Sequence, residues 1–285
     1  MTAATFTTRF APSPTGYMHR GHAFSALTAW SAARDARGRF LLRIEDTDFT
    51  RCRPEYETAI YQDLAWLGLE WETPVRRQSE HRDAYAEALG RLERRGLLYR
   101  CFRTRKEVLA AMAGAPHADD PADPLAFTGG PLALDDEAER LARGEPFAWR
   151  LSLARAEAAV GGFATLRWRE EGVDAGEHHA RPERLGDMVL GRKDIGAGYV
   201  IASVVDDALQ GVTHVIRGVD LVDVTSVQRL LQALLDLPTP IYRHHRLLTG
   251  PDGRRYAKRD RAETLADLRE RSTTPQALKG ELGFA

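Results

Sequence analysis

Two histidines close to the N-terminus stand where a nucleotide phosphate could bind. His19 and His22 follow a turn, Pro12 to Gly16, that joins a short predicted strand to a predicted helix. At the start of a helix, free backbone N–H groups and the helix dipole favour negatively charged oxygens. Gly21 has no Cβ and would let a base or ribose approach the backbone. The arrangement predicts a phosphate site, with a metal-binding pair or a solvated helix cap as alternatives.

Charged residues of both signs could hold an amino acid. Glu45 ends a predicted strand, at the edge where open α/β sheets bind ligands, and its carboxylate could receive an ammonium group. Arg9 and Arg217 could each bind a carboxylate through two parallel hydrogen bonds. Alternatives stay open, because Glu-Asp-Thr-Asp could cap a helix and a single arginine is usually a surface residue.

A basic segment near the C-terminus could complete the nucleotide site. Gly253 to Asp260 follows turn-forming residues and contains Lys258. A cationic loop that tightens over a triphosphate in the transition state would neutralise the charge that develops on the departing pyrophosphate. The alternative is a basic, solvated loop without a ligand.

The apolar spacing predicts the elements that position these residues. The first part of the chain has a β-α-β-α order, which indicates a parallel sheet with right-handed crossovers. We predict strands over 5–12 and 39–45, and helices over 21–37, after Pro54 and over 81–95. After an insertion, sheet-like patterning resumes over 187–190 and 199–205, followed by strands over 212–217 and 241–248 and helices over 224–235 and 263–271.

The same patterning divides the chain into three regions. Residues 1–97 form the first half of a nucleotide-binding domain, 98–185 form the insertion, and 186–285 form the second half with the basic loop and C-terminal helices. Within the insertion, residues 113–130 lack periodicity and predict a long surface loop.

Composition excludes several classes of protein. The 285 residues carry 40 basic and 41 acidic side chains, so binding of nucleic acid through a global positive field is excluded and any RNA contact must be local. No apolar run could span a bilayer, and the N-terminus lacks the apolar core of a secretory signal, so we expect a cytoplasmic protein. Two cysteines cannot form a disulfide framework.

Four separated motifs resemble those of the glutamyl-tRNA synthetase family. They comprise the Phe-Ala-Pro-Ser-Pro-Thr-Gly turn with its histidine element, Arg-Ile-Glu-Asp-Thr-Asp over 43–48, Val-Val-Asp-Asp over 204–207 and Gly-Val-Thr-His-Val-Ile-Arg-Gly over 211–218. Residues 253–260 resemble a degenerate Lys-Met-Ser-Lys-Ser loop. With the element order, the resemblance implies an α/β fold: a Rossmann-like, doubly wound parallel sheet interrupted by an α+β insertion domain.

The resemblance also implies roles for individual residues. It places His19, His22 and Lys258 in catalysis, and these three residues together with Gly21 around ATP, which brings Mg²⁺. Glu45 would receive the amino group of the substrate glutamate. The expected glutamate pocket comprises Arg9, Phe10, Ala11, Pro12, Ser13, Glu45, Tyr199 and Arg217.

The length of the chain indicates a truncated branch of the family. Complete glutamyl-tRNA synthetases continue into helical domains that read the anticodon, whereas this chain ends soon after Lys258. The resemblance to the truncated paralogues implies activation of glutamate with ATP and its transfer to queuosine, the modified wobble base of tRNA(Asp). The partners would be glutamate, ATP and the anticodon stem-loop of that tRNA, and we expect a monomer that does not bind membranes.

The zinc site that such paralogues often carry in the insertion lacks its ligands here. Cys101 remains, but Arg103 replaces the second cysteine, and Phe127 and Pro131 stand where a tyrosine and the last cysteine would be. A structural zinc site needs four donors, so we predict no zinc. We expect apolar packing around Phe147, Trp149, Leu151 and Trp168 to hold the insertion instead, and the pairs 178–179 and 244–245 to be surface histidines rather than ligands.

Three other functions remain open on the sequence alone. A small nucleotidyltransferase with a His-x-Gly-His helix would need no glutamate pocket. A non-catalytic, RNA-binding relic of a synthetase would explain the altered basic loop over 253–260. Residual charging of an acceptor end is the third.

Overall fold

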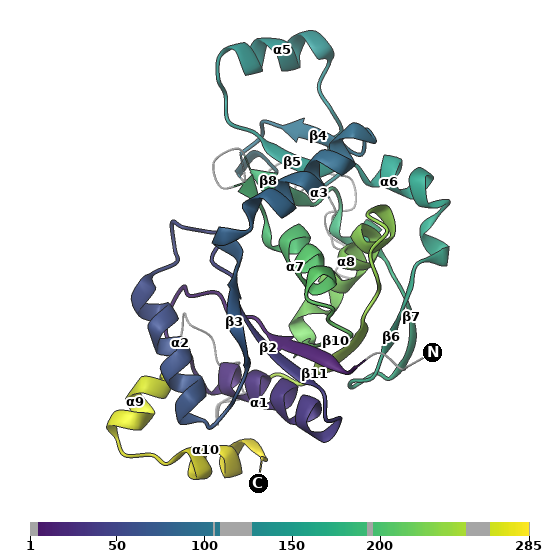
Figure 1. Cartoon of the computed structure of the whole chain (residues 1–285). Helices are drawn as coiled ribbons and strands as arrows, with labels where there is room; N and C mark the ends of the chain where they lie inside the picture. The colour runs from purple at the N-terminus through teal and green to yellow at the C-terminus, as the bar shows by residue number, and fades with distance from the viewer. Residues whose placement is uncertain (1–4, 105, 109–126, 193–195, 249–262, 285) are drawn as a thin grey trace.

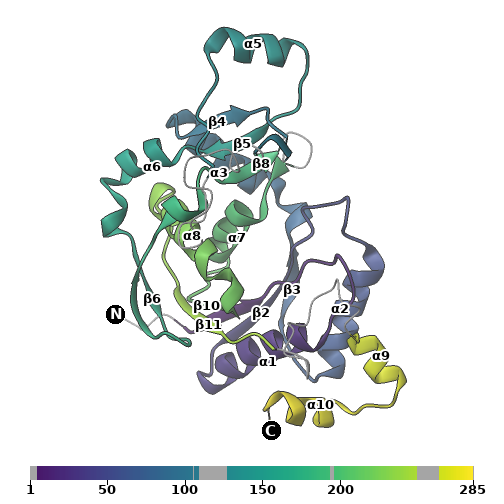
Figure 2. The same cartoon turned by 180° about the vertical axis from the view of Figure 1, so that it is seen from behind.

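The computed structural model describes residues 5–104, 106–108, 127–192, 196–248 and 263–284 (Figures 1 and 2). Within these ranges, no helix is both long and apolar enough to cross a membrane.

A parallel sheet forms the centre of the molecule. One hydrogen-bonded half has the order β3-β2-β1, and the other has the order β10-β11-β6. The halves lie side by side, because the backbone N–H of Thr213 donates to the carbonyl of Thr7 at 2.9 Å. The strands are β1 (Thr7–Phe10), β2 (Arg39–Ile44), β3 (Glu72–Arg77), β10 (His214–Gly218), β11 (Ile241–His245) and β6 (Arg167–Glu170). The chain therefore moves outward from β1 to β3 on one side and from β10 to β11 on the other, where the earlier strand β6 lies next. The reversal of direction between β1 and β10 is typical of doubly wound nucleotide-binding sheets.

Helices cover both faces of this sheet, as Figure 1 shows. One face carries α1 (Arg20–Asp35), α2 (Pro54–Trp66), α9 (Leu265–Glu270) and α10 (Pro275–Leu282), and the other carries α3 (Arg82–Arg94), α7 (Tyr199–Leu209) and α8 (Val222–Leu234). Strand side chains alternate between the two cores: Leu42 and Ile44 pack with the first set, whereas Leu41 packs with the second. The predicted α/β class with a doubly wound sheet is thus confirmed.

A second sheet is antiparallel and combines strands of the expected insertion with strands that follow it. Its strands are β4 (Leu98–Cys101), β5 (Ala148–Leu151), β8 (Val189–Arg192) and β9 (Gly196–Ala197), in that order. It is accompanied by α5 (Leu134–Ala142) and α6 (Leu153–Val160), while β7 (Gly176–His179) pairs with β6. Short 3₁₀ turns occur at Gln78–Glu80, Phe163–Thr165, Pro182–Leu185 and Val219–Leu221.

The strands of the two sheets do not follow the expected domain boundaries. β6 lies within residues 98–185 but pairs with β11 of the parallel sheet, whereas β8 follows residue 185 but pairs with β5. The boundaries at 97 and 185 remain a prediction.

One predicted strand is wrong. Residues 199–205 were expected to resume the sheet, but they form the first two turns of α7. Eight consecutive residues of this helix, from Val200 to Asp207, are buried between the sheet and the neighbouring helices. A helix buried on all sides and a buried strand give the same uniformly apolar pattern, so periodicity could not separate them.

The region expected to lack zinc is filled by an aromatic cluster. Cys101 is buried with Tyr99, Val108 and Phe127. The guanidinium groups of Arg150 and Arg103 lie 4.5 and 5.6 Å from the centre of the Phe127 ring. A single thiol in a cluster whose Phe127 ring is flanked by two cations does not fit a zinc ion, and within the described residues no three metal-binding side chains are grouped. The absence of zinc stays a prediction, which the following experiment tests.

We expect Phe127→Ala to lower the free energy of unfolding by about 3 kcal/mol, because it removes a buried aromatic ring from this cluster. The control is Phe49→Ala, at a side chain that is 53% exposed, which should change stability by less than about 0.5 kcal/mol. A chelator should leave the thermal midpoint of the wild-type protein unchanged. Stoichiometric zinc in the purified protein, or a midpoint lowered by the chelator, would contradict the prediction.

Candidate active site

A cavity of about 520 Å³ opens at the carboxyl ends of the parallel strands. It lies where the two halves of the sheet meet, which is the usual ligand site of a doubly wound sheet. Within the described part of the chain, every residue predicted for the site lines it: Arg9, Phe10, Ala11, Pro12, Ser13, His19, Gly21, His22, Glu45, Tyr199 and Arg217. Lys258 lies outside the described residues. The structure thus brings the residues together, while their roles remain proposals.

The histidine pair is held by the start of α1. His19 is the N-cap residue, and its Nδ1 accepts a hydrogen bond from the Gly21 backbone N–H at 3.1 Å. In return, Nδ1 of His22 accepts from the His19 N–H at 3.1 Å. An imidazole that accepts at Nδ1 carries its proton on Nε2 when neutral, so each ring can donate to an oxygen from its outer edge. The pair therefore suits phosphate oxygens better than a metal ion.

Gly21 also has a local structural role that was not predicted from the sequence. A Cβ at this position would lie 2.9 Å from Cε1 of His19, which is closer than real Cβ contacts. The glycine therefore makes room for the His19 ring, in addition to lining the cavity.

A buried arginine organises the acidic side of the cavity. Arg43 is fully buried, and its guanidinium donates to Glu45 at 3.0 Å and to Asp207 at 2.7 Å. The same Asp207 carboxylate accepts from Nε of Arg9 at 3.0 Å. Since Arg43 belongs to β2 and Asp207 to α7, this network joins two elements that are 164 positions apart in the chain.

The pKa values of the two carboxyl groups in this network are shifted in opposite directions. Burial raises the pKa of Glu45 above its usual range, although Arg43 and Arg9 act against it. Burial has the same tendency at Asp207, but there the guanidinium groups of Arg9 and Arg43 prevail and lower the pKa. Asp207 is thus held as an anion that orients two arginines, whereas Glu45 lacks enough positive charge. A bound ammonium group would supply that charge.

Arg217 presents a second cationic group to the cavity from the end of β10. Its Nη2 donates to Thr225 at 2.6 Å and to the carbonyl of Leu221 at 3.2 Å, while its Nε faces His244 at 3.2 Å. Its Nη1 is buried and has no hydrogen-bond partner among the described residues. Such a donor is costly unless a ligand accepts from it.

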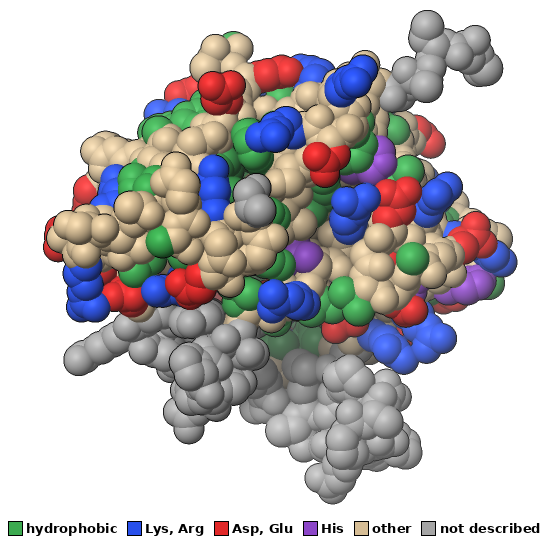
Figure 3. All heavy atoms as spheres, turned by 90° about the horizontal axis from the view of Figure 1, so that it is seen from below, with side chains coloured by type: hydrophobic (Ala, Val, Ile, Leu, Met, Phe, Trp, Pro, Cys, Tyr) green, Lys and Arg blue, Asp and Glu red, His purple; other side chains and the backbone are tan. Residues whose placement is uncertain are grey.

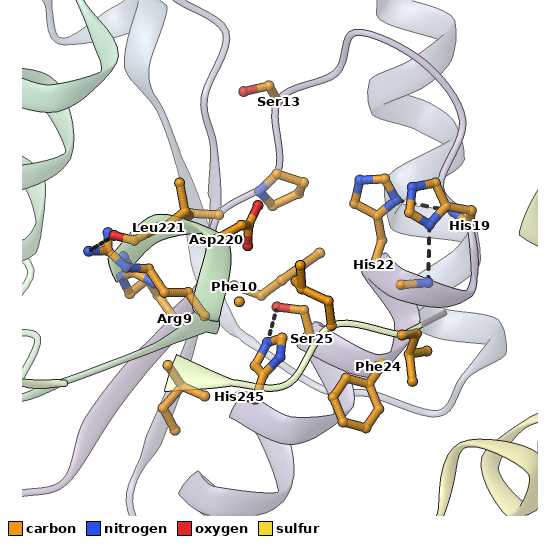
Figure 4. Close-up of a pocket in the computed structure, with 18 of the residues that line it drawn as sticks. Arg9, Phe10, Ser13, His19, His22, Phe24, Ser25, Asp220, Leu221 and His245 are labelled. Atoms are coloured by element: carbon orange, nitrogen blue, oxygen red, sulfur yellow. Dashed lines mark hydrogen bonds between the residues drawn. The ribbon is translucent and has the colours of Figure 1, made fainter. Parts of the chain in front are cut away.

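Figure 4 shows how these groups are distributed. Arg9 lies on one side of the cavity and His19 and His22 lie on the other, with Phe10 between them. The cavity therefore offers one place with opposite charges for a small zwitterion and a second place for phosphate, next to each other.

Part of the cavity lining was not predicted from the sequence. Phe24, Ser25, Asp220, Leu221 and residues 245–248 also face the cavity, and His245 lies 3.1 Å from the hydroxyl of Ser25 (Figure 4). Most of these residues directly follow β10 or β11. Open α/β sheets bind ligands at the carboxyl ends of their strands, so the reason for choosing Glu45 also applies to these residues. The expectation that His244 lies on the surface is wrong, since its side chain is only 2% exposed.

We expect Arg43→Met to lower the free energy of unfolding by about 3–5 kcal/mol, because it leaves the Glu45 and Asp207 carboxylates buried without their shared cation. Arg39→Met on the same strand is the matched control. Its pair with Glu72 is exposed, so it should cost less than about 1 kcal/mol. Urea unfolding of both variants measures the difference, and equal losses would contradict the role of Arg43.

Comparisons with known proteins agree with this geometry. Residues 5–282 match the family model of tRNA synthetases class I (E and Q), catalytic domain. Glutamyl-Q tRNA(Asp) synthetase of Rhodobacter capsulatus is 42% identical over 283 residues, which are 97% of this chain and 99% of that protein. Glutamate-tRNA ligase 2 of a Ruegeria species is also 42% identical, over 95% of this chain but only 59% of its own length.

Solved structures give the same result for the fold. A glutamate tRNA ligase from Elizabethkingia meningosepticum, crystallised in complex with its amino acid, superimposes with a TM-score of 0.71 at 26% identity. The match covers 90% of this chain and 52% of the ligase. The family resemblance and the predicted fold class are thereby confirmed: this chain belongs to the class I tRNA synthetases (E and Q) through the catalytic domain of that family.

Proposed function

We propose that this protein is a ligase that activates glutamate with ATP and transfers it to the queuosine base of tRNA(Asp). The observation that carries the proposal is the cavity, where a buried acid, two buried arginines and a histidine pair are brought together. The relatives support the choice of acceptor. Three proteins named Glutamyl-Q tRNA(Asp) synthetase are each 42% identical to this chain, which covers 80–99% of their length.

Glutamate would be held at both ends by opposite charge. Its ammonium group would lie against Glu45, whose raised pKa reflects burial without sufficient positive charge. A carboxylate of the substrate would accept from Nη1 of Arg217, with Arg9 as the second guanidinium on this side. Tyr199, at the start of α7, and Ser13 would close the pocket around the amino acid.

Activation then requires positioning and neutralisation of charge rather than proton transfer. An oxygen of the glutamate α-carboxylate attacks the α-phosphorus of ATP, the bond from this phosphorus to the β-phosphate oxygen breaks, and glutamyl-adenylate and pyrophosphate form. His19 and His22 donate from Nε2 to phosphate oxygens at the start of α1. The Mg²⁺ that accompanies ATP, together with Lys258, would neutralise the departing pyrophosphate.

Transfer uses the activated carbonyl. A hydroxyl of the cyclopentene diol of queuosine attacks the carbonyl carbon of glutamyl-adenylate, and AMP leaves with the oxygen that linked it to glutamate. The anticodon stem-loop would take the surface on which larger relatives receive an acceptor stem. Positive and negative side chains are interspersed on the face in Figure 3, which agrees with local RNA contacts rather than a broad cationic surface. We infer that the protein acts as a monomer in the cytoplasm, where charged tRNAs are made.

The proposal is tested by transfer of labelled glutamate to purified tRNA. We expect ATP-dependent labelling of tRNA(Asp) that contains queuosine. Two controls, tRNA(Asp) without queuosine and tRNA(Glu), should remain at background. Labelling of tRNA(Glu) would instead show charging of an acceptor end, and a lack of labelling in all three would contradict the proposal.

The first step is tested separately by glutamate-dependent exchange between ATP and pyrophosphate. We expect His19→Ala to lower the exchange rate by about 100-fold, because it removes a donor to the phosphates, and Lys258→Ala to lower it by a similar factor. The control is His178→Ala, at a histidine of the insertion that stacks on Trp168 and does not line the cavity. Wild-type exchange rates in either of the first two variants would remove the role assigned to that residue.

A further inference from the structure

Three buried polar side chains from neighbouring strands are connected by hydrogen bonds in a row that ends in the cavity. Glu170 of β6 lies 2.7 Å from Nδ1 of His244 on β11, and Nε2 of His244 lies 3.2 Å from Nε of Arg217 on β10. All three side chains are at most about 5% exposed. Only Arg217 lines the cavity, so Glu170 and His244 stand behind it.

The hydrogen bonds around Glu170 define the protonation of the histidine. One carboxylate oxygen accepts from the backbone N–H groups of His244 and Gly172 at 2.8 and 2.7 Å. The other oxygen faces Nδ1 of His244, and a carboxylate can only accept, so Nδ1 carries a proton. The Nε2 atom of the neutral ring is then an acceptor, as required by the Nε–H of Arg217.

The hydrogen bond to Nε2 of His244 helps to fix the orientation of the Arg217 guanidinium. Nε is directed to His244 and Nη2 to Thr225 and the Leu221 carbonyl, which leaves Nη1 as the donor without a partner in the described residues. A planar guanidinium that is held at two nitrogens has no freedom to turn its third nitrogen away. The direction in which Arg217 meets a ligand is therefore determined from behind.

Electrostatics agrees with a neutral His244. Burial lowers its pKa, and the charge of Arg217 lowers it further, while the hydrogen bond to Glu170 acts in the opposite direction. The ring of Tyr242 stacks parallel to it at a centroid distance of 6.0 Å. A protonated ring would place a second cation and a second donor against Arg217.

We propose that Glu170 and His244 are positioning residues that orient Arg217 toward a carboxylate of the substrate. The inference rests on the proposed function, since it takes glutamate as the ligand of Arg217. It also gives the insertion a part in amino-acid recognition, because Glu170 belongs to residues 98–185 although its strand joins the parallel sheet.

Glu170→Gln tests this inference with almost no change in shape. The amide oxygen can replace the carboxylate oxygen that accepts from the two backbone N–H groups, but the amide NH₂ then donates toward Nδ1 of His244. The histidine must move its proton to Nε2, where it opposes the donor of Arg217. We expect the KM for glutamate in the exchange reaction to rise by about 10-fold or more, with the KM for ATP unchanged.

The tautomer of His244 provides an independent readout. In ¹⁵N NMR spectra, the wild-type protein should show His244 protonated at Nδ1, and the E170Q variant should show it protonated at Nε2. Glu171→Gln is the matched control, because the neighbouring residue loses the same charge but contacts Arg243 and Arg169 instead. It should change neither the tautomer nor the KM for glutamate.

The outcomes separate this inference from the proposed function. Wild-type exchange with an unchanged KM for glutamate in E170Q would overturn the positioning role alone, whereas a wild-type protein without glutamate-dependent exchange would overturn both. If E170Q does not fold, His244→Phe takes its place, since it keeps the ring but removes the acceptor for Arg217. The same selective rise in the KM for glutamate is expected, and an unchanged KM would overturn the inference.

Discussion

The buried guanidinium of Arg43 is the interaction on which the rest of the site depends. It lies between Glu45 and Asp207 without access to solvent, and Asp207 in turn holds Arg9. Charges in such a place are tolerated only when each has partners, so the network permits one arrangement of these side chains. Because it links β2 to α7, two distant parts of the chain must come together before the cavity is complete.

The network also explains how one cavity can serve two ligands with different charge. At Glu45, burial raises the pKa despite the ion pair with Arg43, so a further positive charge would be favourable there, while Nη1 of Arg217 is a donor without a partner among the described residues. A dicarboxylic amino acid supplies both missing groups. The histidines at the start of α1 lie on the opposite side of the cavity from Arg9 (Figure 4). A phosphate bound to them would therefore occupy a separate place next to the amino acid.

Much of this could be predicted from local patterns. The position at a strand end made Glu45 a candidate, and the turn before α1 made His19 and His22 candidates, because these signals lie within a few residues of one another. The family resemblance then assigned their roles. Tyr199 was assigned only through the family resemblance, and its helix was mistaken for a strand. His244 was taken for a surface residue, since its partner Glu170 lies 74 positions away and no local pattern reveals such a pairing. The role of Lys258 stays a prediction outside the described residues.

In the proposed complex, opposite charges hold glutamate at both ends beside a triphosphate that binds to the histidines. The most direct measurement is a crystal structure of the protein with glutamate and an unreactive analogue of ATP. We expect the ammonium group on Glu45, a carboxylate on Arg217, and phosphate oxygens within hydrogen-bond distance of His19 or His22. Ligands bound far apart, or glutamate bound without contact to Glu45 and Arg217, would contradict it.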